Sequence, residues 1–302
     1  MALLALAREW IRNSHGTLTV ATVDHGLREE SSAEAEFVAR ICTRWNLPHE
    51  ILSLSGLQGP GNLPARARDA RYDALSGWAL RNSIPTVLLG HTMDDQAETV
   101  LMRLARGSGV EGLSGIPSEL VWNGVFYKRP LLKTRRAALR DWLQRRDIEW
   151  IEDPTNEDSR YDRVKAREAL GLLGPLGITT EGLAATADRL TRQRQGLEAA
   201  AEQLADTAVR FDDGIAFLDR DALRGSVPDT AMRVLAQMLQ QIGGNRYRPR
   251  FRALEPLYER IISTEETTVT LARCLITLQR DHIRVTPEQR SDNEANRRAA
   301  DS

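Results

Sequence analysis

The N-terminal part of the chain alternates between short apolar runs and longer segments with apolar residues at helical spacing. Residues 18–23 (LTVATV) are typical of a buried strand, and residues 32–45 place Ala35, Val38 and Cys42 on one helical face. The same reading predicts strands at 50–54 and 86–90 and helices at 63–80 and 94–106. This alternation predicts an α/β fold with a doubly wound parallel sheet, whose ligands bind at the carboxyl ends of the strands.

The beginning of the chain is already helical in pattern. Residues 1–11 (MALLALAREWI) form an apolar helix face with no Ser, Thr, Asp or Asn cap before it. We therefore expect a further strand and loop upstream, so that the first strand of the sheet is missing from this sequence. An uncapped terminal helix is the alternative.

A second, smaller domain follows the sheet. Residues 153–156 (DPTN) read as a turn, residues 161–170 as a short helix, and the glycine-rich segment 171–177 as a boundary. We expect a first domain at 1–175, a helical α+β domain at 176–286 with strands near 215–218, 268–271, 274–278 and 282–285, and a disordered polar tail at 287–302.

A leucine repeat runs through the second domain's first helix. Leu183, Leu190, Leu197 and Leu204 recur every seven residues. Such a stripe either packs within its own chain, which we favour, or forms a coiled-coil seam that would make the protein a homodimer.

Composition narrows the class of protein. The chain has 302 residues, is 41% hydrophobic and carries a formal net charge of −1. It contains no apolar run of membrane-spanning length and no signal peptide, so we expect a cytoplasmic protein. Its two cysteines, Cys42 and Cys274, lie far apart without a CxxC motif. They argue against a disulfide framework, and we predict no metal site.

Positive charge is concentrated in two stretches. Residues 128–146 hold eight Lys or Arg against one Asp, and residues 246–252 read RYRPRFR. Nucleic-acid binding needs such a local surplus even when the whole chain is balanced. Leu139, Trp142 and Leu143 mark the buried face of a helix in the first stretch, which predicts that Arg136, Arg140 and Arg145 point mostly outward. The candidate nucleic-acid contacts are Arg135, Arg136, Arg140, Arg246, Arg248 and Arg250.

The most informative segment is residues 90–99 (GHTMDDQAET), where a buried strand ends in His91 and a helix opens with carboxylates. Acidic residues in a first helical turn have a structural explanation as caps, and for Asp94 that explanation stays open. Asp95 and Glu98 are three residues apart and share a helical face. With His91 they form a polar cluster at a strand's carboxyl edge, suited to binding an ammonium group or activating an amine.

Residues 90–116 (GHTMDDQAETVLMRLARGSGVEGLSGI) resemble the signature segment of tRNA(Ile)-lysidine synthases, which belong to the N-type ATP pyrophosphatase group with its adenine nucleotide alpha hydrolase-like fold. Four other segments agree in order and spacing: VDHGLR at 23–28, NLPARARDARYDAL at 62–75, RPLL at 129–132 and EDPTNEDSRYDR at 152–163. The resemblance is strong over residues 1–170 and loose beyond.

The resemblance implies a two-step ligation. ATP, with Mg²⁺, adenylates the oxygen on carbon 2 of the wobble cytidine of a CAU anticodon, and the side-chain amine of free L-lysine then displaces AMP. The modified tRNA(Ile) decodes as Ile rather than Met. It implies that Asp95, Glu98 and His91 are catalytic and that the carboxylates hold lysine, while Asp24 and His25 line the nucleotide side.

Two departures from the family pattern concern the substrates. The family's RNxxR pattern appears here as Arg163-Val164-Lys165-Ala166-Arg167, which retains both substrate-binding arginines but not the Asn. A solvated pair of arginines is the alternative. The phosphate-binding SGGxDS loop does not occur in this sequence. Arg106 is a further candidate for binding ATP phosphate, unless Gly107 beside it simply ends the helix.

Two competing functions remain open at this stage. A tRNA 2-thiolation enzyme would use the same ATP chemistry, but such enzymes typically depend on CxxC arrangements. A tRNA-binding pseudoenzyme without ATP activity is the other.

Overall fold

The computed structural model describes residues 1–14, 16–24, 26, 30–54, 62–151, 162–263 and 266–288. The chain divides into two compact units, Met1–Thr191 and Arg192–Ser302. The division falls inside helix α8 (Thr180–Ala208), later than the glycine-rich segment at which the sequence pattern places it. That segment instead ends α7 (Asp162–Leu173) and forms the short 3-10 helix Gly174–Leu176. The expected disordered tail at 287–302 starts too early, because Pro287 is the last residue of β10 and residue 288 is also described. Residues 289–302 and the DPTN turn lie outside the described residues.

The first unit is an α/β domain. Its elements run α1 (Ala2–Arg12), β1 (Val20–Asp24), α2 (Glu30–Arg44), β2 (His49–Ser53), α3 (Leu63–Arg81), β3 (Thr86–Leu88), α4 (Met93–Ala105), α5 (Val110–Leu113), β4 (Glu119–Trp122), β5 (Val125–Lys128), α6 (Arg136–Gln144) and α7. The strands predicted near 18–23, 50–54 and 86–90 are confirmed. Strands β4 and β5 were not expected.

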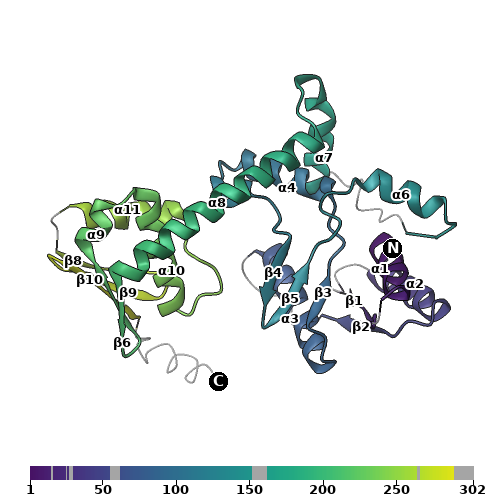
Figure 1. Ribbon diagram of the computed structural model, residues 1–302, viewed down its shortest axis with the longest axis horizontal. Helices are drawn as coiled ribbons and strands as arrows, with labels where there is room; N and C mark the ends of the chain where they lie inside the picture. Colours follow the sequence, from purple (N-terminus) through teal and green to yellow (C-terminus); the bar gives the residue numbers. More distant parts are fainter. Residues whose placement is uncertain are drawn as a thin grey trace, which may run out of the picture. The chain divides into compact units, whose positions relative to one another are not determined.

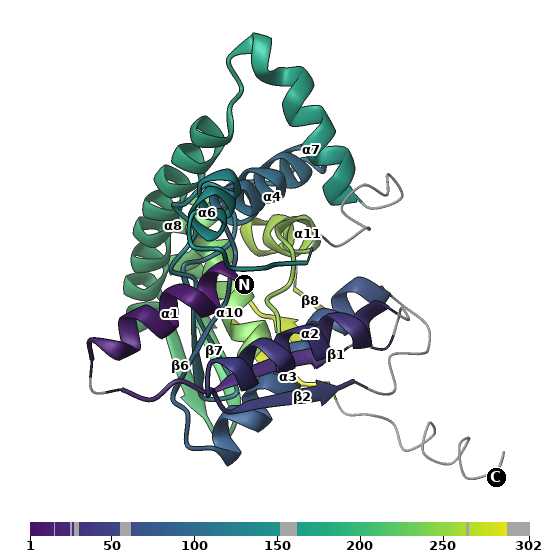
Figure 2. The same cartoon turned by 90° about the vertical axis from the view of Figure 1, so that its right-hand side faces the viewer.

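The strands of the first unit form two hydrogen-bonded groups. β1 pairs with β2 in parallel, β3 pairs with β5 in parallel, and β4 adds to β5 in antiparallel register. Helix α2 packs along the β1–β2 pair, as Figures 1 and 2 both show. The predicted parallel α/β arrangement is therefore present, extended by an antiparallel edge strand.

Helix α3 supplies the core beneath the second group. Tyr72, Leu75 and Ala79 follow helical spacing and are buried together with Val125 and Tyr127 of β5. The Tyr127 hydroxyl donates to the Tyr72 carbonyl over 3.1 Å and also contacts the Ser76 hydroxyl at 2.7 Å, so the polar atoms within this core are paired. This packing fixes the position at which β3 ends.

The second unit is an α+β domain, as predicted. An antiparallel sheet in the order β6-β7-β10-β9-β8 packs against α9, α10 and α11. The bounds are β6 (Val209–Asp212), β7 (Ile215–Asp219), α9 (Arg220–Gly225), α10 (Pro228–Ile242), α11 (Phe251–Ile262), β8 (Thr267–Leu271), β9 (Cys274–Leu278) and β10 (His282–Pro287).

The leucine repeat of α8 is at least partly intramolecular. Leu204 packs against the core of the second unit, beside the fully buried Ala201. This agrees with the interpretation that the stripe packs within its own chain. No described helix is both long and apolar enough to span a membrane.

Candidate active site

The candidate site lies between the end of β3 and the beginning of α4. Thr92 is the N-cap of α4, and Asp95 closes a capping box: its Oδ2 accepts from the Thr92 backbone N–H at 2.7 Å and from the Thr92 hydroxyl at 2.6 Å. Burial alone would raise the pKa of Asp95, but these hydrogen bonds and the charges of Arg136 and Arg163 hold it below its ordinary value. Asp95 therefore caps the helix with one oxygen, while Oδ1 faces Arg136.

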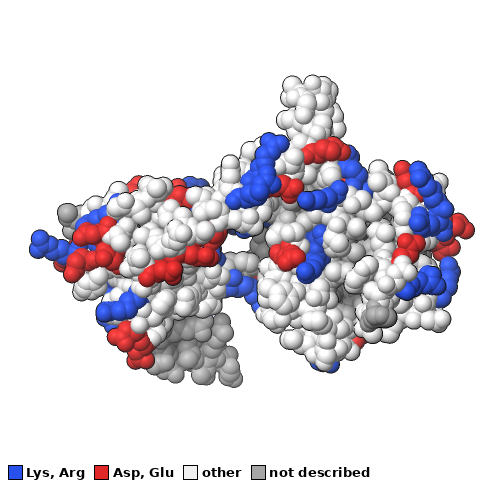
Figure 3. Space-filling view, in the orientation of Figure 1, with Lys and Arg blue, Asp and Glu red and all other residues white. Residues whose placement is uncertain are grey.

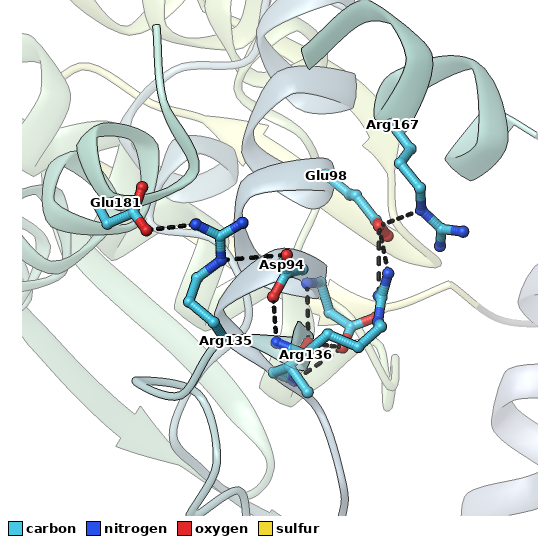
Figure 4. A network of polar contacts seen from close by, with 8 residues as sticks. Asp94, Glu98, Arg135, Arg136, Arg167 and Glu181 are labelled. Carbon is cyan, nitrogen blue, oxygen red and sulfur yellow. Dashed lines mark hydrogen bonds and ion pairs between the residues drawn. The ribbon is translucent and has the colours of Figure 1, made fainter. Parts of the chain in front are cut away.

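Asp94 has a structural role that the capping interpretation only partly anticipated. Its Oδ2 accepts from the backbone N–H of Arg136 at 2.6 Å, and its Oδ1 accepts from Arg135 Nε at 3.3 Å. A carboxylate at the N-terminus of α6 satisfies an otherwise unpaired helical N–H group. Asp94 thus ties the beginning of α6 to the beginning of α4 (Figure 4).

Glu98 is the most buried acid of the cluster, with 1% of the residue exposed. Its Oε1 accepts from Arg167 Nε at 3.1 Å and from Arg136 at 3.3 Å, as Figure 4 shows. Its Oε2 is also buried and finds no hydrogen-bond partner among the residues that the structure describes. A buried carboxylate oxygen normally has a donor. Glu98 Oε2 therefore has acceptor capacity that the described residues do not use.

Arg136 turns toward these carboxylates, so the expectation that it faces outward is wrong. Its Nη2 lies 3.1 Å from Asp95 Oδ1 and its Nη1 3.3 Å from Glu98 Oε1, and only 28% of its side chain is exposed. The first turn of α6 is held against α4 by Asp94, which brings the long arginine side chain within reach of the pair. Arg136 is the residue of this site that sequence reasoning assigned elsewhere.

His91 lies at the carboxyl end of β3, as predicted, and is uncharged near neutral pH. Burial and the neighbouring Arg129 guanidinium lower the pKa of His91 to about 4. Arg129 Nε donates to His91 Nδ1 at 3.3 Å. The imidazole therefore accepts a hydrogen bond at Nδ1.

Arg129 does not belong to a basic surface, although it lies in the basic stretch 128–146. It is 3% exposed and donates to the Pro117 carbonyl at 2.6 Å and the Tyr72 hydroxyl at 2.7 Å. Its role is to hold the β5 end and His91 in place.

The structure brings only one of the two arginines from the RNxxR-like segment onto the carboxylates. Arg167 of α7 reaches Glu98, whereas Arg163 is exposed and influences Asp95 only through its charge. Val164, which replaces the family's Asn, is 5% exposed and packs as an apolar residue.

Comparison with known proteins assigns the sequence to a family. The PP-loop domain family matches residues 1–172. A tRNA(Ile)-lysidine synthase of Ruegeria pomeroyi is 44% identical, covering 94% of this chain and 67% of that protein. The chain belongs to the tRNA(Ile)-lysidine synthase family. Synthases of Hyphomonas neptunium and Methylobacterium nodulans are each 38% identical, and the chain covers 78% and 82% of their lengths.

The lysidine synthase family assignment agrees with the fold. The U34-tRNA thiolase NcsA from Methanococcus maripaludis, solved with its [4Fe-4S] cluster, superimposes with a TM-score of 0.53 at 16% identity, covering 64% of this chain and 67% of that chain. At this identity the likeness supports the α/β architecture alone. Here both cysteines, Cys42 and Cys274, are buried, and burial raises the pKa of each thiol.

The residues that the lysidine synthase resemblance placed on the nucleotide side are only partly described. Asp24 ends β1 and accepts from the Ser32 hydroxyl at 2.9 Å, from the Gly26 N–H at 3.0 Å and from Ser31, so it organises the turn into α2. His25 lies outside the described residues. Arg106 forms an exposed ion pair with Asp162 at 2.7 Å, and Gly107, at φ +67°, follows the end of α4. The structure is thus compatible with a phosphate contact from Arg106 and equally with Gly107 simply ending the helix.

The remaining candidate tRNA contacts of this synthase family member lie on both units. In the first unit Arg140 is exposed, and Arg135 pairs with Asp94 and Glu181. In the second unit Arg246, Arg248 and Arg250 are exposed, and Arg248 Nη1 lies 2.8 Å from Glu198 Oε1. On the face shown in Figure 3, Lys and Arg side chains are interspersed with Asp and Glu.

A pocket of about 420 Å³ opens beside Asp95. Asp95 and Arg136 contribute polar surface to it, and Leu131, Leu139 and Leu143 contribute apolar surface. A pocket with this combination suits a ligand with an aliphatic stem and a polar end. In the part of the chain that the structure describes, no group of three acidic, His or Cys side chains could hold a metal ion.

Proposed function

We propose that this member of the lysidine synthase family joins free L-lysine to carbon 2 of the wobble cytidine in a tRNA(Ile) with a CAU anticodon. ATP first adenylates the base, and the lysine side-chain amine then displaces AMP. The product changes decoding from Met to Ile. A tRNA substrate of this kind places the reaction in the cytoplasm.

One observation supports this function best: the carboxylate oxygen of Glu98 that has no donor among the described residues. Glu98 Oε2 is buried without a donor among the described residues, and Asp95 and Arg136, which share its ion-pair cluster, line a pocket with apolar walls. A lysine side chain offers both an amine donor and an apolar stem. Asp95 and Glu98 accordingly bind the substrate amine.

The reaction also requires the triphosphate to be held. We assign Mg²⁺ to the ATP substrate rather than to a protein site, because the described residues contain no cluster that fits a metal ion. Asp24 and His25 are proposed to line the nucleotide side. Arg106 is the candidate for an additional phosphate contact, since its guanidinium is exposed.

The tRNA contacts are proposed from arginines at the surface. Arg140 of the first unit and Arg246, Arg248 and Arg250 of the second are exposed, and Arg135 is half-buried. All five would bind phosphate oxygens. We remove Arg136 from this set because its side chain is only 28% exposed and reaches inward to both Asp95 and Glu98.

The function is tested by incubating the protein with ATP, radiolabelled lysine and tRNA(Ile) bearing CAU, and measuring the label retained in the RNA. We expect incorporation that depends on ATP and is lost when the wobble cytidine is replaced. No incorporation, while an active synthase labels the same tRNA in parallel, would contradict the proposal. Retention of tRNA on the protein in that case would favour a non-catalytic tRNA-binding protein.

A further inference from the structure

The four side chains that meet at Glu98 balance in charge. Asp95 and Glu98 contribute two carboxylates, and Arg136 and Arg167 contribute two guanidinium groups. Arg136 is the member that contacts both carboxylates. The cluster is therefore neutral before a ligand enters, although its acids alone would attract a cation.

We propose that Arg136 is a positioning residue that keeps this subsite neutral, so that substrate lysine is held there with its side-chain amine uncharged. The inference rests on the proposed function. Only the uncharged amine has the lone pair that attacks an adenylated base, whereas the amine of free lysine is protonated at neutral pH. Two carboxylates without Arg136 would instead retain the unreactive ammonium form.

The geometry favours the neutral amine in two ways. Glu98 Oε1 is already occupied by Arg136 and Arg167, which leaves Oε2 as the acceptor for one N–H of the amine. Burial at this point and a neighbouring guanidinium both disfavour a further positive charge. The proton that the ammonium loses on binding passes to the solvent.

Other charged or titratable groups face this cluster from each element packed against it. They are Asp94 on α4, Arg135 on α6, Arg163 on α7, and His91 at the end of β3. Among them only His91 ordinarily titrates near neutrality, and here it stays uncharged above about pH 4. The α-amino group of Met1 also lines the neighbouring pocket, and burial lowers its pKa from its ordinary value. Proton release is therefore assigned to the lysine amine by the difference between the wild-type protein and Arg136→Gln, which leaves Met1 unchanged.

Calorimetry of lysine binding in buffers of different ionisation heat measures the protons released, without needing ATP or tRNA. We expect the wild-type protein to release about one proton per lysine bound at pH 7.5. In Arg136→Gln, we expect little proton release and lysine binding about tenfold tighter. The pH at which kcat of the complete reaction rises should shift upward by about one unit. Arg136→Lys should restore part of the release.

Arg81→Gln is the matched control, because Arg81 is an exposed arginine paired with Glu50 elsewhere in the first unit. It should leave proton release unchanged. Wild-type binding without proton release would overturn the proposal, and that titration needs no variant. Equal proton release by wild type and a folded Arg136→Gln would also overturn it. A wild-type protein that binds no lysine at all would instead contradict the proposed function.

Discussion

Replacing Glu98 with Gln tests the amine-binding site with the smallest change of shape. The Glu98 side chain is 2% exposed and pairs with Arg136 and Arg167 through one oxygen, while the other oxygen has no donor among the described residues. Glutamine keeps the volume but removes the charge. One of the two carboxylate oxygens also becomes an NH₂ group, which donates, whereas Arg136, Arg167 and the substrate amine all require an acceptor. We expect both lysine binding and stability to fall.

The two effects differ in size. A hydrogen bond to a charged group contributes about 1.5–3 kcal/mol, so lysine affinity should fall roughly 10- to 100-fold. Breaking a fully buried ion pair costs about 3–5 kcal/mol, but the side chains of Arg136 and Arg167 are 28% and 37% exposed and can rehydrate. With that screening, the free energy of unfolding should fall by about 1–2 kcal/mol.

Lysine titration calorimetry and urea denaturation measure these two quantities on the same protein. Glu181→Gln is the matched control, since Glu181 also pairs with an α6 arginine, Arg135, but its side chain is 56% exposed. The control should change stability by less than about 1 kcal/mol and leave lysine affinity unaltered. A Glu98→Gln protein that binds lysine as tightly as wild type would refute the assignment of Glu98 to the amine.

Three further predictions follow from the exposed, buried and titrating groups. Arg140→Gln, on an exposed position of α6, should reduce the salt dependence of tRNA binding by about one phosphate contact; an unchanged slope in filter binding would exclude Arg140 from the interface. Arg220→Leu should lower the unfolding free energy by more than about 3 kcal/mol, because four carbonyls lose a buried donor; an unchanged urea midpoint would contradict this. His91→Gln should flatten the loss of stability between about pH 6.5 and 4, where the unfolded chain binds a proton that the folded histidine, with its pKa of about 4, does not. Identical pH slopes for both proteins would refute it.

The alternating pattern was sufficient to predict β1 to α4, because each buried strand there is a run of apolar residues and each helix has an apolar face. It missed the β4–β5 hairpin, although a signal was present. Asn123 and Gly124 form its turn with φ of 47° and 79°, and an Asn-Gly pair between alternating residues is typical of such a hairpin. Asp213 and Gly214 similarly connect the unpredicted β6 to β7.

Helical periodicity also gave a wrong prediction for the first turn of α6, where Arg136 faces inward. It located Leu139 and Leu143 on the buried face, where the structure has them. It did not show that Asp94 holds the backbone of Arg136 against another helix, because that contact joins residues 42 positions apart. A side chain at the edge of an apolar face, with several methylene groups, can reach inward from there.

The partners of Glu98 illustrate why the carboxylates were recognisable and their counter-ions were not. A buried carboxylate needs a pairing cation, so any sequence that buries an acid on a helix implies a basic partner somewhere. The requirement does not say which one. Eight basic residues lie in the stretch 128–146 alone, and the two arginines that reach Glu98 are 38 and 69 positions from it. Only the packing of α6 and α7 against α4 selects Arg136 and Arg167, and this selection makes the cluster neutral.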